Sequence, residues 1–503
     1  MIGSDQQLIS VDLSTFIKTY DIRGLVEEQL TPRVCRALGA AFARVIVEPD
    51  GHRAMVLGHD MRDSSPALAT AFGEGVRAAG LDVVSIGLCA TDQLYFASGT
   101  MKCPGAMITA SHNPATYNGI KLCRSEAVPL EMATGLALVR DLAQWLLDRG
   151  DVHPATAAPP VAATGVLTHR DVLTDYAAYL HSLVDLRGIR PLRVVVDAGN
   201  GMAGLTAPAV LGSGGLRDSA DPATGTGAVD MIGLYLELDG TFPHHEANPL
   251  DPANIVDLQA AVLAQRADLG LAFDGDADRC FVVDERGAAV TASAITALVA
   301  AREIEKETAR GVPAEQITVV HNSITSRAVP ETVTTLGACA VVTKVGHSYV
   351  KATMAEHDAV FGGEHSGHYY FRDFWRADTG MLAALHVLAA LGHQSANSTM
   401  SELAGPYDPY AHSGEINSVV RDPTAAVKRV RQWATQTQPG SFVRDFDGVA
   451  ISGSDADGGF WTVSVRASNT EPLLRLNVEA RDEETMAQVR DSVLAVIVGT
   501  VSS

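Results

Sequence analysis

The sequence predicts a protein made of several α/β domains, and three observations lead to this fold class. The chain has 503 residues, which at roughly 150 residues per domain corresponds to three or four domains. It is 47% hydrophobic and 19% charged, a balance that can form buried cores and excludes an intrinsically disordered chain. Short apolar runs typical of buried strands alternate with helical patterns along the first third of the chain.

The first elements have recognisable start and stop signals. The pair Thr31–Pro32 predicts a helix start, because threonine caps a helix and proline fits its first turn. An apolar strand pattern follows over Ala54–Leu57. A second helix is expected between Ser65 and Gly80, and the next strand over Leu81–Ile86.

The rest of the chain continues this alternation and indicates where domains begin. A stretch rich in Ala, Pro and Thr over residues 154–165 is typical of a linker. Further helices and strands are expected over Asp171–Leu183, Leu192–Asp197, Leu269–Phe273, residues 380–391, Pro423–Trp433 and from Asp482 onward. We therefore expect four domains, over residues 1–163, 164–267, 268–393 and 394–503.

Composition excludes several classes of function. Acidic residues outnumber basic ones by 59 to 38, and a net charge of -21 repels nucleic acid and anionic membrane surfaces. The six cysteines are scattered without a C-x-x-C pair, as in a cytoplasmic protein with reduced thiols. We see no signal peptide and no membrane-spanning segment. The sequence therefore predicts a cytoplasmic protein without nucleic-acid or membrane partners, and it leaves monomer and homodimer open.

Three carboxylates at alternate positions form the most informative motif. Asp274, Asp276 and Asp278 lie between two apolar strand-like runs, where their charges would repel one another without a cation. Oxygen ligands favour a hard ion such as Mg²⁺. An EF-hand is excluded because Arg279 stands where that loop needs glycine. A phosphatase loop with Asp274 as nucleophile remains an alternative.

Ser111 is a candidate phosphoryl acceptor. It lies in a turn of small residues over Thr109–Pro114, next to a histidine and ten residues before Lys121. Taken alone, the same segment could be an ordinary turn stabilised by its Asn-Pro pair.

The segment Gly363–His368 suits a loop that binds a polyol. Glu364 and Ser366 could hydrogen-bond adjacent sugar hydroxyl groups, and His368 has an ordinary pKa suited to proton transfer near neutrality. A purely structural turn is the alternative.

A fourth segment is suited to binding a phosphate monoester. Arg466 offers a planar fork of donors, and short hydroxyl or amide side chains follow at Ser468, Asn469 and Thr470. Weaker cationic signals stand at Arg23, Lys344 and His347.

Together and in this order, these segments resemble the α-D-phosphohexomutase superfamily, from Tyr20–Gly24 to Arg466–Thr470. The resemblance implies three related mixed α/β domains and a smaller C-terminal domain around a central cleft. It implies that Ser111 is phosphorylated and completes a Mg²⁺ site with Asp274, Asp276 and Asp278. The residues that it implies for phosphoryl and proton transfer are Ser111, Arg23, Lys121, Arg279 and His368. Those that it implies for substrate binding are Tyr20, Lys344, His347, Glu364, Ser366, Arg466, Ser468, Asn469 and Thr470.

Within the superfamily, the form of the Gly363–His368 loop and the run Tyr369–Trp375 resemble bacterial phosphomannomutases. This implies interconversion of mannose 6-phosphate and mannose 1-phosphate through a hexose 1,6-bisphosphate, which also activates the enzyme. A phosphoglucomutase or dual-specificity enzyme is the alternative, and a phosphoglucosamine mutase a less favoured one. An aspartyl sugar phosphatase and a non-catalytic sugar-phosphate-binding protein are alternatives of other classes. One departure is Cys89–Thr91, where many members have a P-T-P-like segment.

Overall fold

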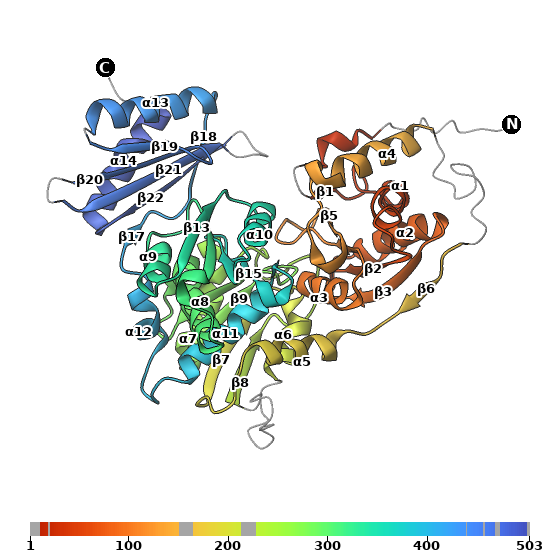
Figure 1. The fold of residues 1–503 in the computed structure, drawn as a ribbon, viewed down its shortest axis with the longest axis horizontal. Coiled ribbons are helices and arrows are strands. Elements are labelled where there is room, and N and C mark those ends of the chain that lie inside the picture. The colour runs from red at the N-terminus through yellow and green to blue at the C-terminus, as the bar shows by residue number, and fades with distance from the viewer. Residues whose placement is uncertain are drawn as a thin grey trace. The chain divides into compact units, whose positions relative to one another are not determined.

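The chain forms two units, each built of β-sheets with helices packed against them (Figure 1). The structure is a computed structural model and describes residues 11–18, 21–149, 164–212, 228–438, 440–455, 458–467 and 473–499. Unit 1 comprises residues 1–290 and 366–401, and unit 2 comprises residues 291–365 and 402–503. Among the described residues, no helix is both long enough and apolar enough to cross a membrane.

The first sheet of unit 1 has the strand order β1-β5-β4-β2-β3-β6. Its strands are β1 (Ile22–Leu25), β2 (Ala54–His59), β3 (Asp82–Leu88), β4 (Gly105–Ile108), β5 (Tyr117–Cys123) and β6 (Leu167–His169). Its helices are α1 (Pro32–Phe42), α2 (Ser65–Ala78), α3 (Thr91–Met101) and α4 (Ala137–Asp148). The side chain of Thr31 caps α1 as the sequence predicts, accepting a hydrogen bond from the Val34 amide. Apolar residues of α1, α2 and α4 form one core with the sheet.

The second sheet of unit 1 has the order β11-β10-β9-β7-β8. Its strands are β7 (Leu192–Asp197), β8 (Val229–Leu234), β9 (Leu269–Phe273), β10 (Cys280–Asp284) and β11 (Ala289–Val290). The helices here are α5 (Leu173–Leu183), α6 (Ala203–Leu211) and α7 (Val256–Gln265). β9 pairs in parallel with β7, so the sequence division at residue 268 separates two strands of one sheet. Strand patterns alone do not indicate which strands pair, because pairing depends on contacts between distant residues.

Unit 1 also contains the hairpin of β15 (Tyr369–Phe371) and β16 (Ala377–Asp378), followed by α11 (Gly380–Gly392). Every residue of α11 is buried, which explains its apolar sequence on all faces. The short helix α12 (Met400–Ala404) lies where the chain passes from unit 1 into unit 2.

Unit 2 contains three parallel strands, in which β12 (Thr318–Asn322) pairs with both β13 (Cys339–Thr343) and β14 (Phe361–Gly363). The helices of this part are α8 (Ala292–Ala309), α9 (Ala328–Thr335) and α10 (His347–Glu356). Helices cover the faces of a parallel sheet and bury its central strands. Accordingly, Val319 and Val320 of β12 are fully buried.

The C-terminal part of unit 2 is an antiparallel sheet in the order β17-β22-β21-β20-β19, with β18 also paired to β22. Its strands are β17 (Ala411–His412), β18 (Ile416–Val419), β19 (Phe442–Asp445), β20 (Val449–Ser454), β21 (Phe460–Ala467) and β22 (Leu473–Ala480). Alternate residues of β20–β22 form one core with α13 (Pro423–Thr437) and α14 (Glu483–Val498), as strand periodicity requires (Figure 1).

Candidate active site

Ser111 follows the buried strand β4 and lies in a tight turn. Its side chain is only 3% exposed, and its backbone has φ of 50°, a left-handed conformation that few residues other than glycine adopt. The Ser111 amide donates to the Thr109 hydroxyl at 2.9 Å. The Ser111 hydroxyl donates to Asp274 Oδ2 at 2.7 Å and lies 3.2 Å from Nδ1 of His112. The structure thus brings the predicted phosphoryl acceptor against the predicted metal loop.

The metal loop connects β9 and β10, which pair antiparallel. Asp274 and Asp276 are fully buried and Asp278 is 1% exposed. A β-carbon on Gly275 would lie 2.4 Å from the Ser111 carbonyl oxygen, so only glycine permits this approach of the two loops. The packing of the two backbones holds the serine beside the carboxylates.

The three aspartates fit a divalent cation. Their ligand oxygens all lie within 4.8 Å of one another. Oδ1 of Asp276 and Oδ1 of Asp278 are buried and have no hydrogen-bond partner in the described part of the chain. Buried carboxylate oxygens normally have partners, and a ligand set made only of oxygen atoms suits Mg²⁺.

Lys121, on β5, is the ammonium group nearest this loop among the contacts described. Its Nζ lies 2.7 Å from Asp276 Oδ2 and 2.5 Å from Asp278 Oδ2. Burial alone would lower the pKa of Lys121, but the two carboxylates raise it above its ordinary value. Burial opposes ionisation of Asp276 as well, yet Lys121 holds the pKa of Asp276 below its ordinary value. Burial and the Asp276 charge raise the pKa of Asp278, so the two carboxylates differ in their affinity for a proton.

Two guanidinium groups complete the surroundings of Ser111. Arg279 donates from Nε to Asp274 Oδ2 at 3.0 Å, and its amide donates to Asp274 Oδ1. Arg23, on β1, donates to the Ala110 carbonyl and to the Asn113 side chain, both in the loop of Ser111. Each arginine therefore binds one of the two loops that meet at the serine.

His368 lies beside the metal loop and is held by an aspartate that sequence reasoning missed. Its Nδ1 is 2.9 Å from Asp378 Oδ2, at the end of β16, and 3.9 Å from Asp278 Oδ1. Burial alone would lower the pKa of His368, but Asp278 and Asp378 raise it. The motif around His368 gave no signal for Asp378, which is ten residues away.

Thr91 is a second contact that was not predicted. Its hydroxyl donates to Asp276 Oδ2 at 2.6 Å, and its amide donates to the Asp276 carbonyl at 3.0 Å. The segment Cys89–Thr91, which differs from the P-T-P-like segment of many superfamily members, therefore contacts Asp276, one of the three aspartates of the metal loop. The contact is made by the Thr91 hydroxyl.

Unit 2 holds a separate cluster around Glu364. Glu364 follows β14 and is 1% exposed. Its Oε1 accepts hydrogen bonds from Asn322 Nδ2 at 3.1 Å and from the Gly346 amide at 3.0 Å. This joins Glu364 to the loop that carries Lys344 and His347. Ser366 lies in unit 1 and is half-buried.

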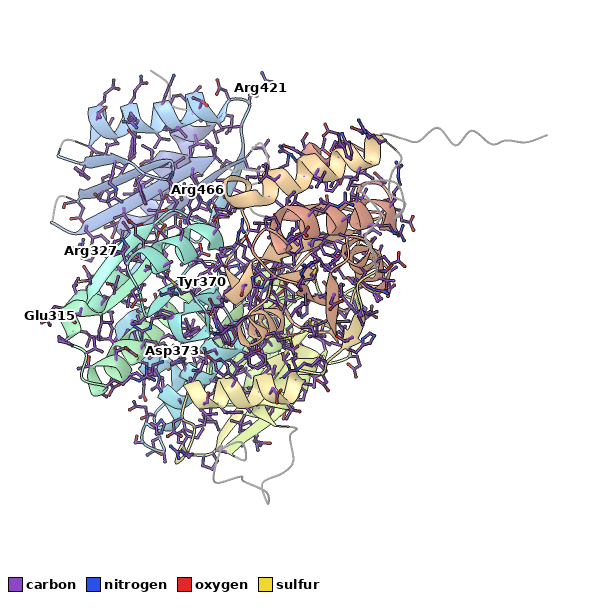
Figure 2. The ribbon with its side chains drawn as sticks, turned by 45° about the vertical axis from the view of Figure 1, so that its right-hand side comes forward. Glu315, Arg327, Tyr370, Asp373, Arg421 and Arg466 are labelled. Carbon is purple, nitrogen blue, oxygen red and sulfur yellow. The ribbon has the colours of Figure 1, made fainter. Side chains whose placement is uncertain are left out.

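Arg466 lies on β21 in the C-terminal sheet, and Figure 2 labels it there. Its NH2 donates to Glu415 Oε2 at 3.0 Å, and Arg475 donates to the other carboxylate oxygen at 3.0 Å. Glu415 had no sequence signal, since it lies 51 residues from Arg466. The predicted residues Tyr20, Ser468, Asn469 and Thr470 lie outside the described residues.

Comparison with known families covers most of the chain. Four domain models described as phosphoglucomutase/phosphomannomutase match it. They are the α/β/α domains I, II and III at residues 15–145, 174–287 and 292–410, and the C-terminal domain at residues 415–496.

Individual proteins agree with this match. A protein of Xanthomonas campestris pv. campestris named "Phosphohexose mutases" is 38% identical over 94% of this chain and 96% of its own. A phosphomannomutase of Salmonella typhimurium is 36% identical over 95% of this chain and 98% of its own. A crystal structure of a phosphoglucomutase/phosphomannomutase family protein from Burkholderia thailandensis has a TM-score of 0.79 at 28% identity, covering 97% of this chain and 98% of that one.

Proposed function

Since the chain belongs to the phosphoglucomutase/phosphomannomutase family and is an isomerase of the phosphohexomutase type, we propose that it interconverts mannose 6-phosphate and mannose 1-phosphate. The reaction passes through a phosphoserine at Ser111 and a hexose 1,6-bisphosphate, which also serves as activator. A preference for mannose phosphates is supported by relatives named phosphomannomutase, and activity on glucose phosphates is the nearest alternative.

One observation carries the proposal. The buried Ser111 hydroxyl lies 2.7 Å from Asp274, within a set of three carboxylates that can hold one divalent cation. A serine in an ordinary turn is not normally placed beside three buried carboxylates. Burial of three carboxylates is costly without a cation, so the arrangement favours a site for phosphoryl transfer.

The charged residues have distinct parts in this chemistry. Mg²⁺ held by Asp274, Asp276 and Asp278 would neutralise charge on the phosphoryl group. Arg279 binds Asp274 and adds positive charge beside Ser111, while Lys121 balances the two other carboxylates. Arg23 fixes the serine loop through the Ala110 carbonyl. Positioning and charge compensation supply most of the catalysis in such transfers.

The proton and the sugar involve other residues. As the sugar oxygen bonds to phosphorus and the bond to Ser111 Oγ breaks, His368 receives the proton of the sugar hydroxyl, with Asp378 fixing the imidazole orientation. Glu364 and Ser366 are suited to bind sugar hydroxyl groups, and Arg466 to bind the phosphate that is not transferred. The bisphosphate then turns around and returns its other phosphoryl group to Ser111.

The aspartyl phosphatase alternative is disfavoured by the bonding of Asp274. Its Oδ2 accepts from Ser111 and Arg279, and its Oδ1 accepts from the Arg279 amide. These bonds make Asp274 the partner of the Ser111 hydroxyl, so Ser111 is the better-placed nucleophile, and phosphate label on Asp274 instead of Ser111 would favour the phosphatase.

The proposal is tested by ³¹P NMR of the purified protein with Mg²⁺ and a trace of glucose 1,6-bisphosphate. Mannose 1-phosphate, glucose 1-phosphate and glucosamine 1-phosphate are supplied in separate samples. Faster conversion of mannose 1-phosphate to its 6-phosphate is expected. Faster conversion of another sugar phosphate would show that the mannose preference is wrong. Release of inorganic phosphate alone would show that the enzyme is a phosphatase.

The nucleophile is tested by replacing Ser111 with alanine. We expect Ser111→Ala to lose more than about 10³-fold in kcat, because no covalent phosphoryl acceptor remains. Transfer of ³²P from labelled glucose 1,6-bisphosphate to the protein should also disappear. Exposed Ser182 provides the control, and Ser182→Ala should retain both activities. Label that persists in Ser111→Ala would contradict the assignment.

A further inference from the structure

A buried arginine outside the predicted site contacts the loop of Ser111 more extensively than any catalytic candidate does. Arg62 follows β2, and its side chain is 2% exposed. Arginine is almost never buried to this degree unless its donors are satisfied. The carbonyl groups that satisfy Arg62 all belong to one short segment.

That segment is residues 111–117. NH2 of Arg62 donates to the Ser111 carbonyl at 2.8 Å and to the Asn113 carbonyl at 2.6 Å. NH1 donates to the Pro114 carbonyl at 2.9 Å and to the Tyr117 carbonyl at 3.0 Å. One planar group thus fixes four carbonyl groups on both sides of the turn.

Arg62 is itself held in place from two directions. Asp60 Oδ2 lies 3.3 Å from its Nε, and Asp60 Oδ1 accepts hydrogen bonds from the Arg62 amide and the Ser65 hydroxyl. On the face of the guanidinium lies the ring of Phe242, whose centroid is 5.1 Å from the Arg62 Cζ. A β-carbon on Gly240 would lie 2.5 Å from the Arg62 Cα, so the 240–242 segment packs directly on this residue.

We propose that Arg62 is a positioning residue for phosphoryl transfer, which holds Ser111 in the one backbone conformation that points its hydroxyl at the metal loop. Ser111 has φ of 50°, a conformation that serine adopts only where neighbours impose it. NH2 of Arg62 binds the carbonyl of this same residue and that of Asn113, and NH1 binds the carbonyls of Pro114 and Tyr117. This inference depends on the proposed function, because it assumes that Ser111 accepts the phosphoryl group.

A lysine cannot replace this arginine. Its ammonium is a point charge with three donors, whereas the four carbonyl groups match the planar fork of a guanidinium. Arg62→Lys keeps the buried charge opposite Asp60 but leaves carbonyl groups without donors, so the loop should become less well ordered. Misplacement of a reacting group by ~1 Å can lower a rate by ~10².

The test measures how fast Ser111 accepts ³²P from labelled glucose 1,6-bisphosphate in a single turnover, normalised to the folded fraction by circular dichroism. We expect Arg62→Lys to lower this rate and kcat by about 30-fold or more, while KM changes less than about threefold. The matched control is Arg33→Lys, because Arg33 donates to a single carbonyl, that of Leu147, away from the loop. A rate in Arg62→Lys equal to that of Arg33→Lys would overturn the proposal.

Two further measurements separate positioning from simple loss of stability. Phe242→Leu removes the ring from the guanidinium face and should lower the labelling rate several-fold even if Arg62→Lys does not fold. Guanidinium ion at low millimolar concentration should partly restore labelling of Arg62→Ala, whereas sodium should not. Failure of both effects would also overturn the proposal. Absence of label on wild-type Ser111 would instead contradict the proposed function itself.

Discussion

The centre around Ser111 in unit 1 and the arginine cluster around Arg466 in unit 2 both pair cations with carboxylates, but at different depths. Side chains of Asp274, Asp276 and Asp278 are 0–1% exposed, and their partner Lys121 is 13% exposed. In the other cluster, Arg466, Glu415 and Arg475 are 11%, 14% and 29% exposed. Water therefore screens the second cluster more. Charges of the first cluster should control stability and catalysis, whereas those of the second should mainly control binding.

The largest expected effect tests the buried centre. Lys121→Met leaves Asp276 and Asp278 without their common cation, and breaking a buried pair costs about 3–5 kcal/mol of unfolding free energy. Urea unfolding in EDTA should detect this loss, and added Mg²⁺ should offset part of it because the ion replaces the missing charge. Exposed Lys428→Met is the control and should change stability by less than about 0.5 kcal/mol. An equally small change in Lys121→Met would remove the contrast between the two regions.

The next prediction concerns the shallower cluster. Arg466→Ala should raise KM for the hexose phosphate by about 10- to 100-fold, since a charge-assisted hydrogen bond contributes about 1.5–3 kcal/mol. Stability should change little, because Arg475 still pairs with Glu415. Steady-state kinetics and thermal unfolding check both statements. The exposed Arg421, labelled in Figure 2, provides the control Arg421→Ala with an unchanged KM. A large loss of stability without a change in KM would reverse the assignment.

A third pair, His245 and Asp197, whose side chains are 11% and 1% exposed, sharpens the comparison through pH. His245 Nε2 lies 3.1 Å from Asp197 Oδ2, and this hydrogen bond raises the pKa of His245 above its ordinary value of 6.5. Since the folded pKa is the higher one, the stabilisation is fully present below pH 6.5 and is lost as pH rises through the folded pKa. His245→Gln should therefore cost about 1 kcal/mol at acidic pH and almost nothing at alkaline pH. Denaturant unfolding at several pH values, with exposed His169→Gln as control, measures this; a cost independent of pH would contradict it.

The smallest effect is expected at the surface of unit 1. Arg36 and Glu74 form an ion pair whose side chains are 33% and 45% exposed. Glu74→Gln should change unfolding free energy by about 0.2–1 kcal/mol at low salt, and by less at high salt. Unfolding at two salt concentrations tests this. A cost near that of Lys121→Met would mean that depth does not decide the ranking.

Local structure was predictable where each signal is contained in a short segment. The apolar runs around the aspartates form β9 over Leu269–Phe273 and β10 over Cys280–Asp284, and Leu192–Asp197 forms β7. Helix α1 begins at Pro32 as its cap predicts. The expected strand over Leu81–Ile86 is Asp82–Leu88 instead, since strand ends depend on pairing with neighbours rather than on composition.

Supporting residues of the candidate site were not predictable from local pattern. Arg62, Asp378 and Glu415 act on groups that are 49, 10 and 51 residues away. None of the three lies in a distinctive motif. Each reaches its partner only because the fold brings distant segments of the chain together. A sequence motif shows only residues that are close together in the chain. The residues that support those of the site come from distant segments, which the fold brings together.

The division of the chain into units also bears on synthesis at the ribosome. Unit 1 is discontinuous, because it needs residues 366–401 in addition to residues 1–290. The late segment includes α11, whose Gly380 packs on the Arg279 backbone and whose Gly392 packs on Ile189. Until Gly392, the last residue of α11, has been made, the surface that receives this apolar helix is uncovered. Unit 1 therefore stays incomplete, with an apolar surface uncovered, while the whole segment 291–365 is synthesised.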